Sequence, residues 1–242
     1  MRPELENVPF GNRLLDAMPS IARDRFRPHL ETVSLDANQR IHEPGEEVEH
    51  AIFPTRGLIS LVAMMRDGAS VEVGMIGREG MYGVSGILGD DHPTQRAMVQ
   101  LPGAAFRMPS ILLKRAVRSD AALQGLLLRY AQLTLSTAAQ SAACNRLHLL
   151  EQRCARWILS AHDRAGEDTF AMTHEFLAMM LGVRRPGVTV AAQGLQAGGL
   201  ITYNHGTMTV VDRAGLEAAS CECYGQVQAE FHRLLGAQDP SN

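Results

Sequence analysis

The sequence has no long apolar run. The longest, Leu58 to Met65 in a chain of 242 residues, is far shorter than the roughly 20 residues needed to cross a bilayer. The N-terminal stretch Met1–Glu6 also lacks the apolar segment of a secretion signal. We therefore expect a protein outside the membrane, working in the cytoplasm. With 45% apolar and 20% charged residues, the chain can form a hydrophobic core of one large or two smaller domains.

Cysteine is scarce, with only Cys144, Cys154, Cys221 and Cys223 present. Without a secretion signal these four residues do not indicate a disulfide framework. Cys221-x-Cys223 supplies two ligands and resembles no complete zinc site. We expect these two residues to be reduced cysteines near the end of a C-terminal helix, and we predict no metal site.

Signatures of catalysis are missing as well. A metal-dependent enzyme on a small β-barrel needs a His-x-His pair, and the sequence contains none. The Gly-x-Ser-x-Gly, P-loop and dinucleotide-binding fingerprints are also absent. The sequence therefore predicts a protein that is not an enzyme.

Positive charge is not in excess. The net charge is −3, and the last 92 residues carry 7 basic and 10 acidic side chains. Neutralisation of phosphates supplies most of the affinity of proteins for DNA. A DNA-binding hypothesis for this chain therefore requires positive charge concentrated at one place.

From Glu31 to about Met108, short apolar runs alternate with turn residues, which is typical of a β-sandwich or barrel. Two short helices, Arg13–Met18 and Ser20–His29, are expected before it. The expected strands are Val48–Pro54, Gly57–Met65, Ser70–Ile76, Arg96–Leu101 and Ala104–Met108.

A long helix is expected from Ala121 to about Asn145, capped by Ser119 or Asp120. Its apolar residues cover more than one side, so it must bury two faces, one of them against a partner subunit. The residues assigned to this dimerisation helix are Leu126, Tyr130, Leu133 and Thr137. A single buried core helix is the alternative. A second helix is expected at Leu147–Ala165.

The segment Met172 to Val211 has the spacing of a helix-turn-helix. Thr173 can cap a first helix that Gly182 ends, and a second helix follows from Pro186 to Gln196. A hairpin after it, turning at Asn204-His205-Gly206, forms a wing. Ala178 is small enough for the helix crossing, and the apolar positions joining the helices are Leu177, Leu181, Val183, Val188 and Ala191. A helix pair with a structural role remains the alternative.

Between Glu31 and Asp212 the sequence resembles the Crp/Fnr family of bacterial transcription regulators. The matching segments are Leu177–Arg185, Gly199-Leu200-Ile201 and, more loosely, Pro44-Gly45-Glu46, Phe53–Gly57 and Gly83–Gly86. The resemblance implies an α+β fold of three parts. These are a cyclic-nucleotide-binding-like sensor barrel (a double-stranded β-helix, or jelly roll) in residues 1–118, a long dimerisation helix in 119–146, and a winged helix-turn-helix DNA-binding domain in 147–242.

The resemblance also implies a homodimer on a palindromic double-stranded DNA operator, with recognition helices about 34 Å apart in successive major grooves. Arg185 matches a family arginine that contacts guanine, and Arg184 is placed for phosphate. Thr189 and Gln193 are candidate polar readers of bases. RNA polymerase is a further partner that the family allows, although no sequence feature marks a contact patch. The alternative is a ligand-sensing or protein-interaction module whose winged helix no longer binds DNA.

The small-molecule effector is unknown. Cyclic-nucleotide binders of this fold hold the ribose with a Glu in a Gly-Glu-x-Gly-like turn and the phosphate with an Arg. Here the turn reads Gly83-Val84-Ser85-Gly86, and Arg96 is displaced by one residue, so cyclic AMP is not expected. Gly83, Val84, Ser85 and Arg96 are the candidate pocket residues.

Two other family sensors depend on metals. The iron–sulfur sensor needs cysteines near the N-terminus, and no cysteine precedes Cys144, which excludes it. A haem sensor needs an axial ligand in the barrel, for which His42, His50 and His92 are the candidates.

Overall fold

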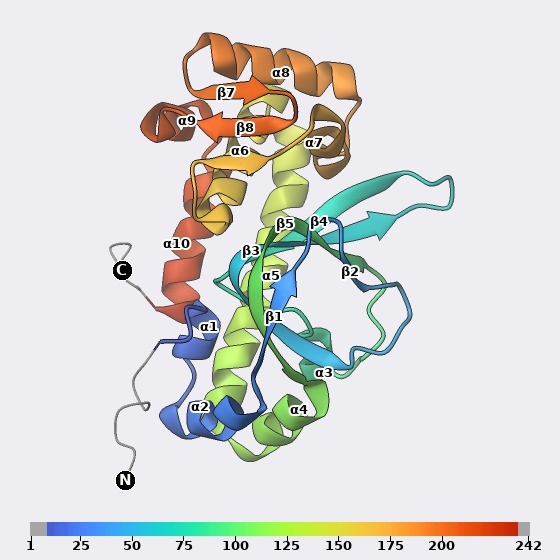
Figure 1. The fold of residues 1–242 in the computed structure, drawn as a ribbon, viewed down its shortest axis with the longest axis vertical. Helices are drawn as coiled ribbons and strands as arrows, with labels where there is room; N and C mark the ends of the chain where they lie inside the picture. The colour runs from blue at the N-terminus through green and yellow to red at the C-terminus, as the bar shows by residue number, and fades with distance from the viewer. Residues whose placement is uncertain (1–8, 237–242) are drawn as a thin grey trace.

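The computed structural model describes residues 9–236. The stretch Met1–Glu6 and the outer ends of the expected domains 1–118 and 147–242 lie outside these residues. A long upright helix stands in the middle of the molecule, with a β-barrel on one side of it and the C-terminal helices above (Figure 1). Within the described part of the chain, no helix has both the length and the apolar character needed to cross a membrane.

The barrel region is a five-stranded antiparallel sheet. Its strand order is β1-β5-β3-β4, with β2 paired to β5. The strands are β1 (Glu31–Leu35), β2 (Arg40–His42), β3 (His50–Met64), β4 (Ser70–Ile76) and β5 (Arg96–Pro109). Apolar side chains from all five strands fill the interior as one buried cluster that includes Leu35, Ile59 and Val99. The predicted α+β fold with an N-terminal jelly-roll-like barrel is confirmed.

The two long strands contradict the expected breaks after Pro54 and Leu101. β3 continues through Gly57 and β5 through Gly103, where the sequence predicted that one strand ends and the next begins. Gly57 has a φ of +91°, and a Cβ on Gly103 would lie 2.1 Å from the carbonyl oxygen of Arg56. The pairing register shifts at this point, so the two glycines let both strands bend together as a bulge.

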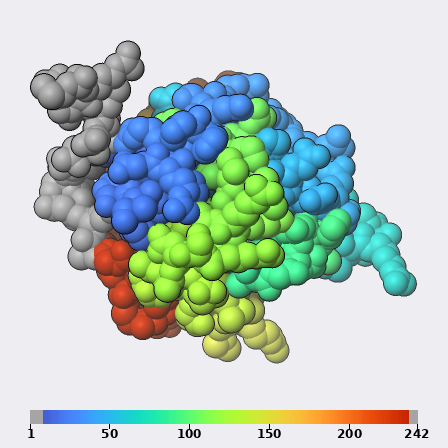
Figure 2. Space-filling model, turned by 90° about the horizontal axis from the view of Figure 1, so that it is seen from below, coloured from blue at the N-terminus to red at the C-terminus, as the bar shows by residue number. Residues whose placement is uncertain are grey.

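Helices close the lower end of the barrel. Seen from below, α1 and α2 lie against α4 and α5, while the β3–β4 hairpin projects from the opposite side (Figure 2). These helices are α1 (Arg13–Asp16), α2 (Ser20–Phe26), the 3₁₀ turn η1 (Arg27–His29), α3 (Ser85–Leu88), α4 (Ser110–Ser119) and α5 (Ala121–Leu147). The Asp120 carboxylate accepts from the backbone N–H of Ala122 and Leu123, so Asp120 caps α5.

The C-terminal region (residues 150–236) contains a helix pair and a small sheet of order β6-β8-β7. Its elements are α6 (Leu150–Ala165), β6 (Thr169–Ala171), α7 (His174–Leu181), α8 (Arg185–Ala197), β7 (Ile201–Asn204), β8 (Thr207–Val210), α9 (Arg213–Ala219) and α10 (Cys223–Leu235). The expected hairpin turn is present, with His205 and Gly206 at positive φ. The extra strand β6 was not expected.

The C-terminal region contacts the rest of the chain on two sides. α10 runs back along α5, where Arg129 Nε donates to the carbonyl of Leu234 at 3.0 Å. On the other side, Val62 and Leu101 of the barrel share a core cluster with Trp157 of α6. The C-terminal region therefore packs directly on the barrel region and on α5.

Candidate nucleic-acid interface

The helix pair α7–α8 forms as the sequence predicted. Thr173 Oγ1 accepts from the N–H of Phe176, and Gly182 ends α7 with a φ of +63°. The positions expected to lock the helices together lie in one core cluster, with Val183 packed at its edge: Leu177, Ala178, Leu181, Val188 and Ala191. The turn thereby fixes the direction of α8 relative to the core.

The start of α8 is open to solvent. Arg184 is its N-cap and Arg185 its first residue, and both are exposed. The Arg185 side chain is 65% exposed, with the Glu175 carboxylate 3.9 Å from Nε. Pro186 and Val190 extend this exposed face, and Gln193 lies further along it. Two guanidinium groups therefore stand at a helix N-terminus, where the helix dipole also favours an anion.

Thr189 is less available than Gln193. It is half-buried, and its hydroxyl donates to the carbonyl of Arg185 at 3.2 Å. The same hydroxyl lies 3.1 Å from Nδ1 of His174. Because a hydroxyl has a single proton, Thr189 could donate to a base only by giving up its bond to the carbonyl of Arg185.

His174 is a site residue that the sequence analysis missed. Its ring stacks on Tyr203 of β7 with centroids 4.1 Å apart, so it connects α7, α8 and the wing. Its Nε2 atom is buried and has no hydrogen-bond partner among the described residues. Burial, reinforced by the nearby Arg185 guanidinium, lowers the pKa of His174 below its usual range. No pattern around residue 174 marks this role, because it depends on the wing folding back.

The residues assigned to the dimerisation helix mostly face the chain's own core. Leu126, Tyr130 and Leu133 are each at most 4% exposed, and they pack against the helices that close the barrel. The Tyr130 hydroxyl donates to the carbonyl of Met81 and accepts from its N–H, both at 3.0 Å. Thr137 is half-buried at the wall of a cavity. This corrects the position of the predicted seam, because these side chains are not available to a second subunit.

The four candidate effector residues do not form an open anion site. Gly83, Val84 and Ser85 make the turn into α3, while Arg96 lies on β5. The Arg96 guanidinium is bound to the Glu43 carboxylate, with Nε 2.9 Å from Oε1. The positive charge that would hold a phosphate is therefore already paired.

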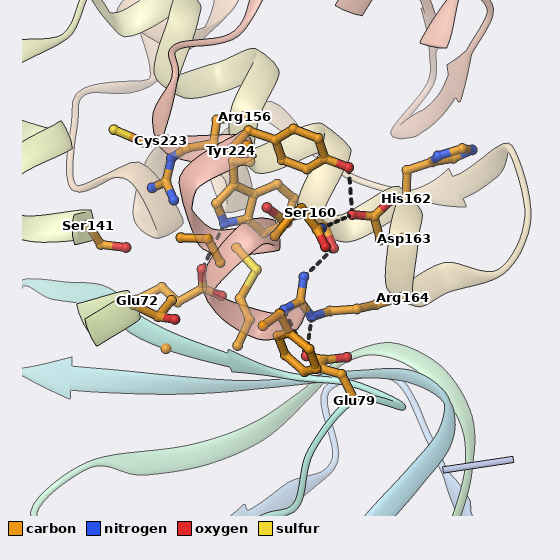
Figure 3. A pocket seen from close by; sticks show the side chains of 18 of the residues that line it. Glu72, Glu79, Ser141, Arg156, Ser160, His162, Asp163, Arg164, Cys223 and Tyr224 are labelled. Carbon is orange, nitrogen blue, oxygen red and sulfur yellow. Dashed lines mark hydrogen bonds and ion pairs between the residues drawn. The ribbon is translucent and has the colours of Figure 1, made fainter. Parts of the chain in front are cut away.

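A cavity of about 870 Å³ lies elsewhere, between the barrel region and the C-terminal region. Glu72 and Glu79 enter it from the barrel side, and Arg156, Ser160 and Arg164 enter it from α6 (Figure 3). None of Gly83, Val84, Ser85 or Arg96 lines it. This cavity is thus separate from the residues that were predicted to hold an effector.

Two polar contacts at this cavity join the regions. Trp157 Nε1 donates to Glu72 at 2.8 Å, and Arg164 Nε donates to Glu79 at 2.8 Å. Ser60 also donates to the Glu72 carboxylate. Burial raises the pKa of Glu72 to about 7, although the hydrogen bonds from Ser60 and Trp157 oppose the shift. A carboxyl group that titrates near neutrality therefore sits between β4 and α6.

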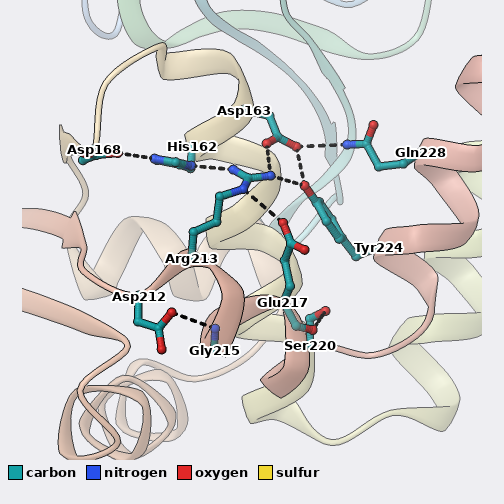
Figure 4. Close-up of polar contacts among 10 residues, drawn as sticks. All are labelled: His162, Asp163, Asp168, Asp212, Arg213, Gly215, Glu217, Ser220, Tyr224 and Gln228. Carbon is teal, nitrogen blue, oxygen red and sulfur yellow. Dashed lines mark hydrogen bonds and ion pairs between the residues drawn. The ribbon is translucent and has the colours of Figure 1, made fainter. Parts of the chain in front are cut away.

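A second polar network fixes α9 and α10 on α6. Arg213 donates to Asp163 at 2.8 Å and to the Tyr224 hydroxyl at 2.7 Å (Figure 4). Tyr224 and Gln228 each donate to the other Asp163 oxygen at 2.9 Å. Because all of these groups bond one another, the network holds the C-terminal helices in place.

The cysteines expected as a two-ligand fragment have further neighbours. Cys221 and Cys223 lie beside Cys144 and His148, and one possible ligand atom from each residue lies within 4.8 Å of the other three. Cys154 is buried separately in α6. Sequence spacing gave no sign of this, because 73 or more residues separate the two pairs.

Comparisons with known proteins support this fold. A family profile described as a Crp-like helix-turn-helix domain matches residues 152–219. FixK2 from Bradyrhizobium japonicum superposes with a TM-score of 0.67 at 15% identity, covering 79% of this chain and 98% of that one. No curated protein sequence matches the chain.

Two other solved structures give the same result. A CRP-family transcriptional regulator from Thermus thermophilus has a TM-score of 0.64 at 19% identity, covering 78% of this chain and 96% of that one. The c-di-GMP-responsive regulator CLP from Xanthomonas campestris has a TM-score of 0.60 at 15% identity, covering 79% and 99%. Residues 152–219 thus form a Crp-like helix-turn-helix domain, within the fold of Crp/Fnr-type transcription regulators.

Proposed function

We propose that this chain, which carries a Crp-like helix-turn-helix domain in the fold of Crp/Fnr regulators, binds a palindromic DNA operator as a homodimer and controls transcription there. The observation that carries the proposal is the pair Arg184 and Arg185, exposed together at the N-terminus of α8. An arginine in the major groove can grip guanine through two hydrogen bonds, and a second can bind phosphate.

The excess of acidic side chains in the C-terminal region limits its non-specific affinity for DNA. The last 92 residues have 10 acidic against 7 basic side chains. Non-specific affinity comes from phosphate neutralisation, so it is weak for such a region. Binding must then depend on correct base contacts by Arg185 and its neighbours, which makes the protein selective for its operator.

The proposed dimer seam lies on the exposed face of α5. Leu128 and Leu135 are 47% and 66% exposed, and Ala142 continues the same seven-residue spacing. Ala138 and Ala139, also exposed, would let two α5 helices approach closely. An apolar stripe with this repeat is the pattern of a paired-helix interface. We therefore assign the seam to this face in place of Leu126, Tyr130 and Leu133.

We propose that the protein does not respond to a cyclic nucleotide. Val84 offers no carboxylate for a ribose hydroxyl, and Arg96 is already bound to Glu43. A regulator of this kind responds to another signal or acts without a small-molecule effector.

The test is selection of bound sequences from random DNA with the purified protein and with Arg185→Ala. We expect a palindromic site for the native protein. Loss of the guanine contact should weaken binding to it by about 5–150-fold, the equivalent of about 1–3 kcal/mol. Arg233→Ala is the matched control, because the Arg233 side chain is 64% exposed but belongs to α10.

Two results would contradict the proposal. Tight binding that is indifferent to sequence would remove the role given to Arg185. If no sequence is enriched, with or without a pool of metabolites, the protein is instead an interaction module whose winged helix does not bind DNA.

A further inference from the structure

Three cysteines and a histidine meet where α5 ends. Cys144 lies in the last turn of α5, and His148 follows that helix directly. Cys221 and Cys223 come from the other side, from the connection between α9 and α10 and from the first position of α10. The three sulfur-bearing residues form a buried cluster of their own, apart from the apolar cores. Two distant segments of the chain are thus joined by thiol groups and an imidazole ring.

The distances are those of ligands around a single ion. Cys144 Sγ is 3.5 Å from Cys221 Sγ, and Cys223 Sγ is 3.5 Å from Nδ1 of His148. Zinc bonds of about 2.3 Å to sulfur and about 2.0–2.1 Å to nitrogen place tetrahedral ligands about 3.8 Å (S···S) and about 3.6 Å (S···N) apart. The four ligand atoms here all lie within 4.8 Å of one another, so small adjustments would complete a tetrahedron. A cluster of several iron atoms would hold its cysteine sulfurs farther apart.

The surrounding contacts also match a metal site. His148 directs Nδ1 toward the sulfurs, and its Nε2 lies 3.2 Å from the carboxylate of Glu222. Metal-binding histidines usually donate the N–H of the other ring nitrogen to a carboxylate in this way. In addition, Gln140 Nε2 donates to Cys223 Sγ at 3.0 Å. Both contacts favour a thiolate and a neutral imidazole oriented toward a common centre.

We propose that Cys144, His148, Cys221 and Cys223 bind one zinc ion. Three thiolates and one imidazole are among the ligand sets of structural zinc sites. On binding, the three thiol protons leave to solvent, His148 stays neutral, and four bonds to zinc form. All four coordination positions are then taken by the protein, so the site is structural.

The ion would fix the joint between the long helix and the C-terminal region. α5 and α6 are connected only by His148 and Leu149. Zinc would tie the end of α5 and His148 of this joint to the start of α10. Arg153, in the first turns of α6, donates to the carbonyl of Leu181 at 2.6 Å, where α7 ends. The start of α6, which follows His148 and Leu149 directly, is thereby held to the turn of the helix-turn-helix.

The first measurement is the metal content of the full-length protein purified without chelator, compared with Cys221→Ser and Cys154→Ala. We expect about one zinc per chain in the native protein and in Cys154→Ala, whose thiol lies outside the site. Cys221→Ser should lose it. Replacing zinc by cobalt should give the visible absorption of tetrahedral Co²⁺ with thiolate charge transfer, again lost in Cys221→Ser and retained in Cys154→Ala.

A second variant tests the geometry without touching a ligand. The Glu222 side chain is 65% exposed, so Glu222→Gln should fold normally. Removing the carboxylate behind His148 should weaken zinc affinity by about 10–100-fold, as measured by competition with a chelator. A chelator should also lower the thermal unfolding midpoint of the native protein, because the ion binds the folded chain.

The proposal is overturned by three results. The first is a protein that contains no metal as purified and binds neither Zn²⁺ nor Co²⁺ when its thiols are reduced. The second is a Cys144–Cys221 disulfide as the stable state with no metal present. The third is iron with inorganic sulfide in place of zinc. If Cys221→Ser does not fold, His148→Gln takes its place, and unchanged zinc affinity in both His148→Gln and Glu222→Gln would equally overturn it.

Discussion

In the C-terminal region, the arginines expected to meet an anion point into solvent, whereas in the barrel region the corresponding arginine is held by a carboxylate. Arg185 is 65% exposed, with its nearest carboxylate oxygen at 3.9 Å. Arg96 is 35% exposed, and the Glu43 oxygen lies 2.9 Å away. An arginine binds an external anion only when no internal one has neutralised it. The two regions therefore differ in the availability of their arginines: the Arg185 guanidinium is open to an external anion, whereas the Arg96 guanidinium is already paired with Glu43.

The largest expected effect comes from disrupting the proposed dimer, because the dimer holds two copies of α8 together. Leu135→Glu places a charge on the proposed seam, so the protein should sediment as a monomer in analytical ultracentrifugation. Affinity for a palindromic operator should fall on the order of 100-fold, because the second half-site no longer benefits from tethering. Affinity for a half-site should not change. Leu88→Glu is the control, since Leu88 is also 60% exposed but lies on α3. If the Leu135→Glu variant is still a dimer, the seam must lie on another surface.

The next prediction distinguishes the role of Arg184 from that of Arg185. Arg184→Ala should weaken binding to all DNA sequences alike, by about tenfold, because a hydrogen bond to a charged group is worth about 1.5 kcal/mol or more. The slope of log affinity against log salt should decrease by about 1. Fluorescence anisotropy at several salt concentrations measures both. A loss confined to one operator sequence would show that Arg184 reads bases.

A different effect, on stability instead of DNA affinity, concerns the contact between the regions. The pKa of Glu72 is raised from 4.5 to about 7 in the folded protein, so the folded state holds a proton that the unfolded chain releases. Its contribution to stability is complete below about pH 4.5 and is lost as the pH rises through about 7, at up to about 1.4 kcal/mol per pH unit. In Glu72→Gln this dependence should be absent.

Urea unfolding across this pH range measures the difference between native protein and Glu72→Gln. Glu47→Gln is the control, since Glu47 is an exposed carboxylate of the barrel region. If Glu72→Gln retains the full pH dependence, the proton is held by another group.

The smallest effect is expected when Arg96 of the barrel region is made as free of its partner as the arginines of α8 are. Glu43→Gln frees Arg96 from its partner, and it should lower the free energy of unfolding by no more than about 1 kcal/mol, as is typical of partly exposed ion pairs. Calorimetry with cyclic AMP should still show no binding, because Val84 leaves the ribose without a carboxylate. Binding by this variant would mean that Glu43 alone closes the barrel site.

Features that depend on residues close together in the sequence were predicted, whereas features that depend on contacts between distant segments were missed. The helix-turn-helix was predicted nearly to its ends, because Thr173 and Gly182 act within a few residues of themselves. The bulge was missed because Gly57 is explained by its neighbour Gly103, 46 positions away in the chain. A lone glycine in a strand pattern looks like a turn until its partner strand is known.

The site was only partly predictable for the same reason. The exposure of Arg184, Arg185 and Gln193 follows from the helix-turn-helix register alone. By contrast, the apolar residues of α5 leave open which face meets the chain's own core, and this is decided by the helices that close the barrel together with α10. The association of Cys144 and His148 with Cys221 and Cys223 likewise requires the C-terminal helices to fold back, which no local pattern encodes.

The return of α10 along α5 has a consequence for synthesis of the chain. Arg129 leaves the ribosome 105 residues before Leu234, the residue whose carbonyl it binds. During that interval the side of α5 that α10 will cover, near Arg129 and Gln140, has no partner from its own chain. Barrel and helix-turn-helix can each form as they emerge, but this side of α5 is covered only after α10 has been synthesised.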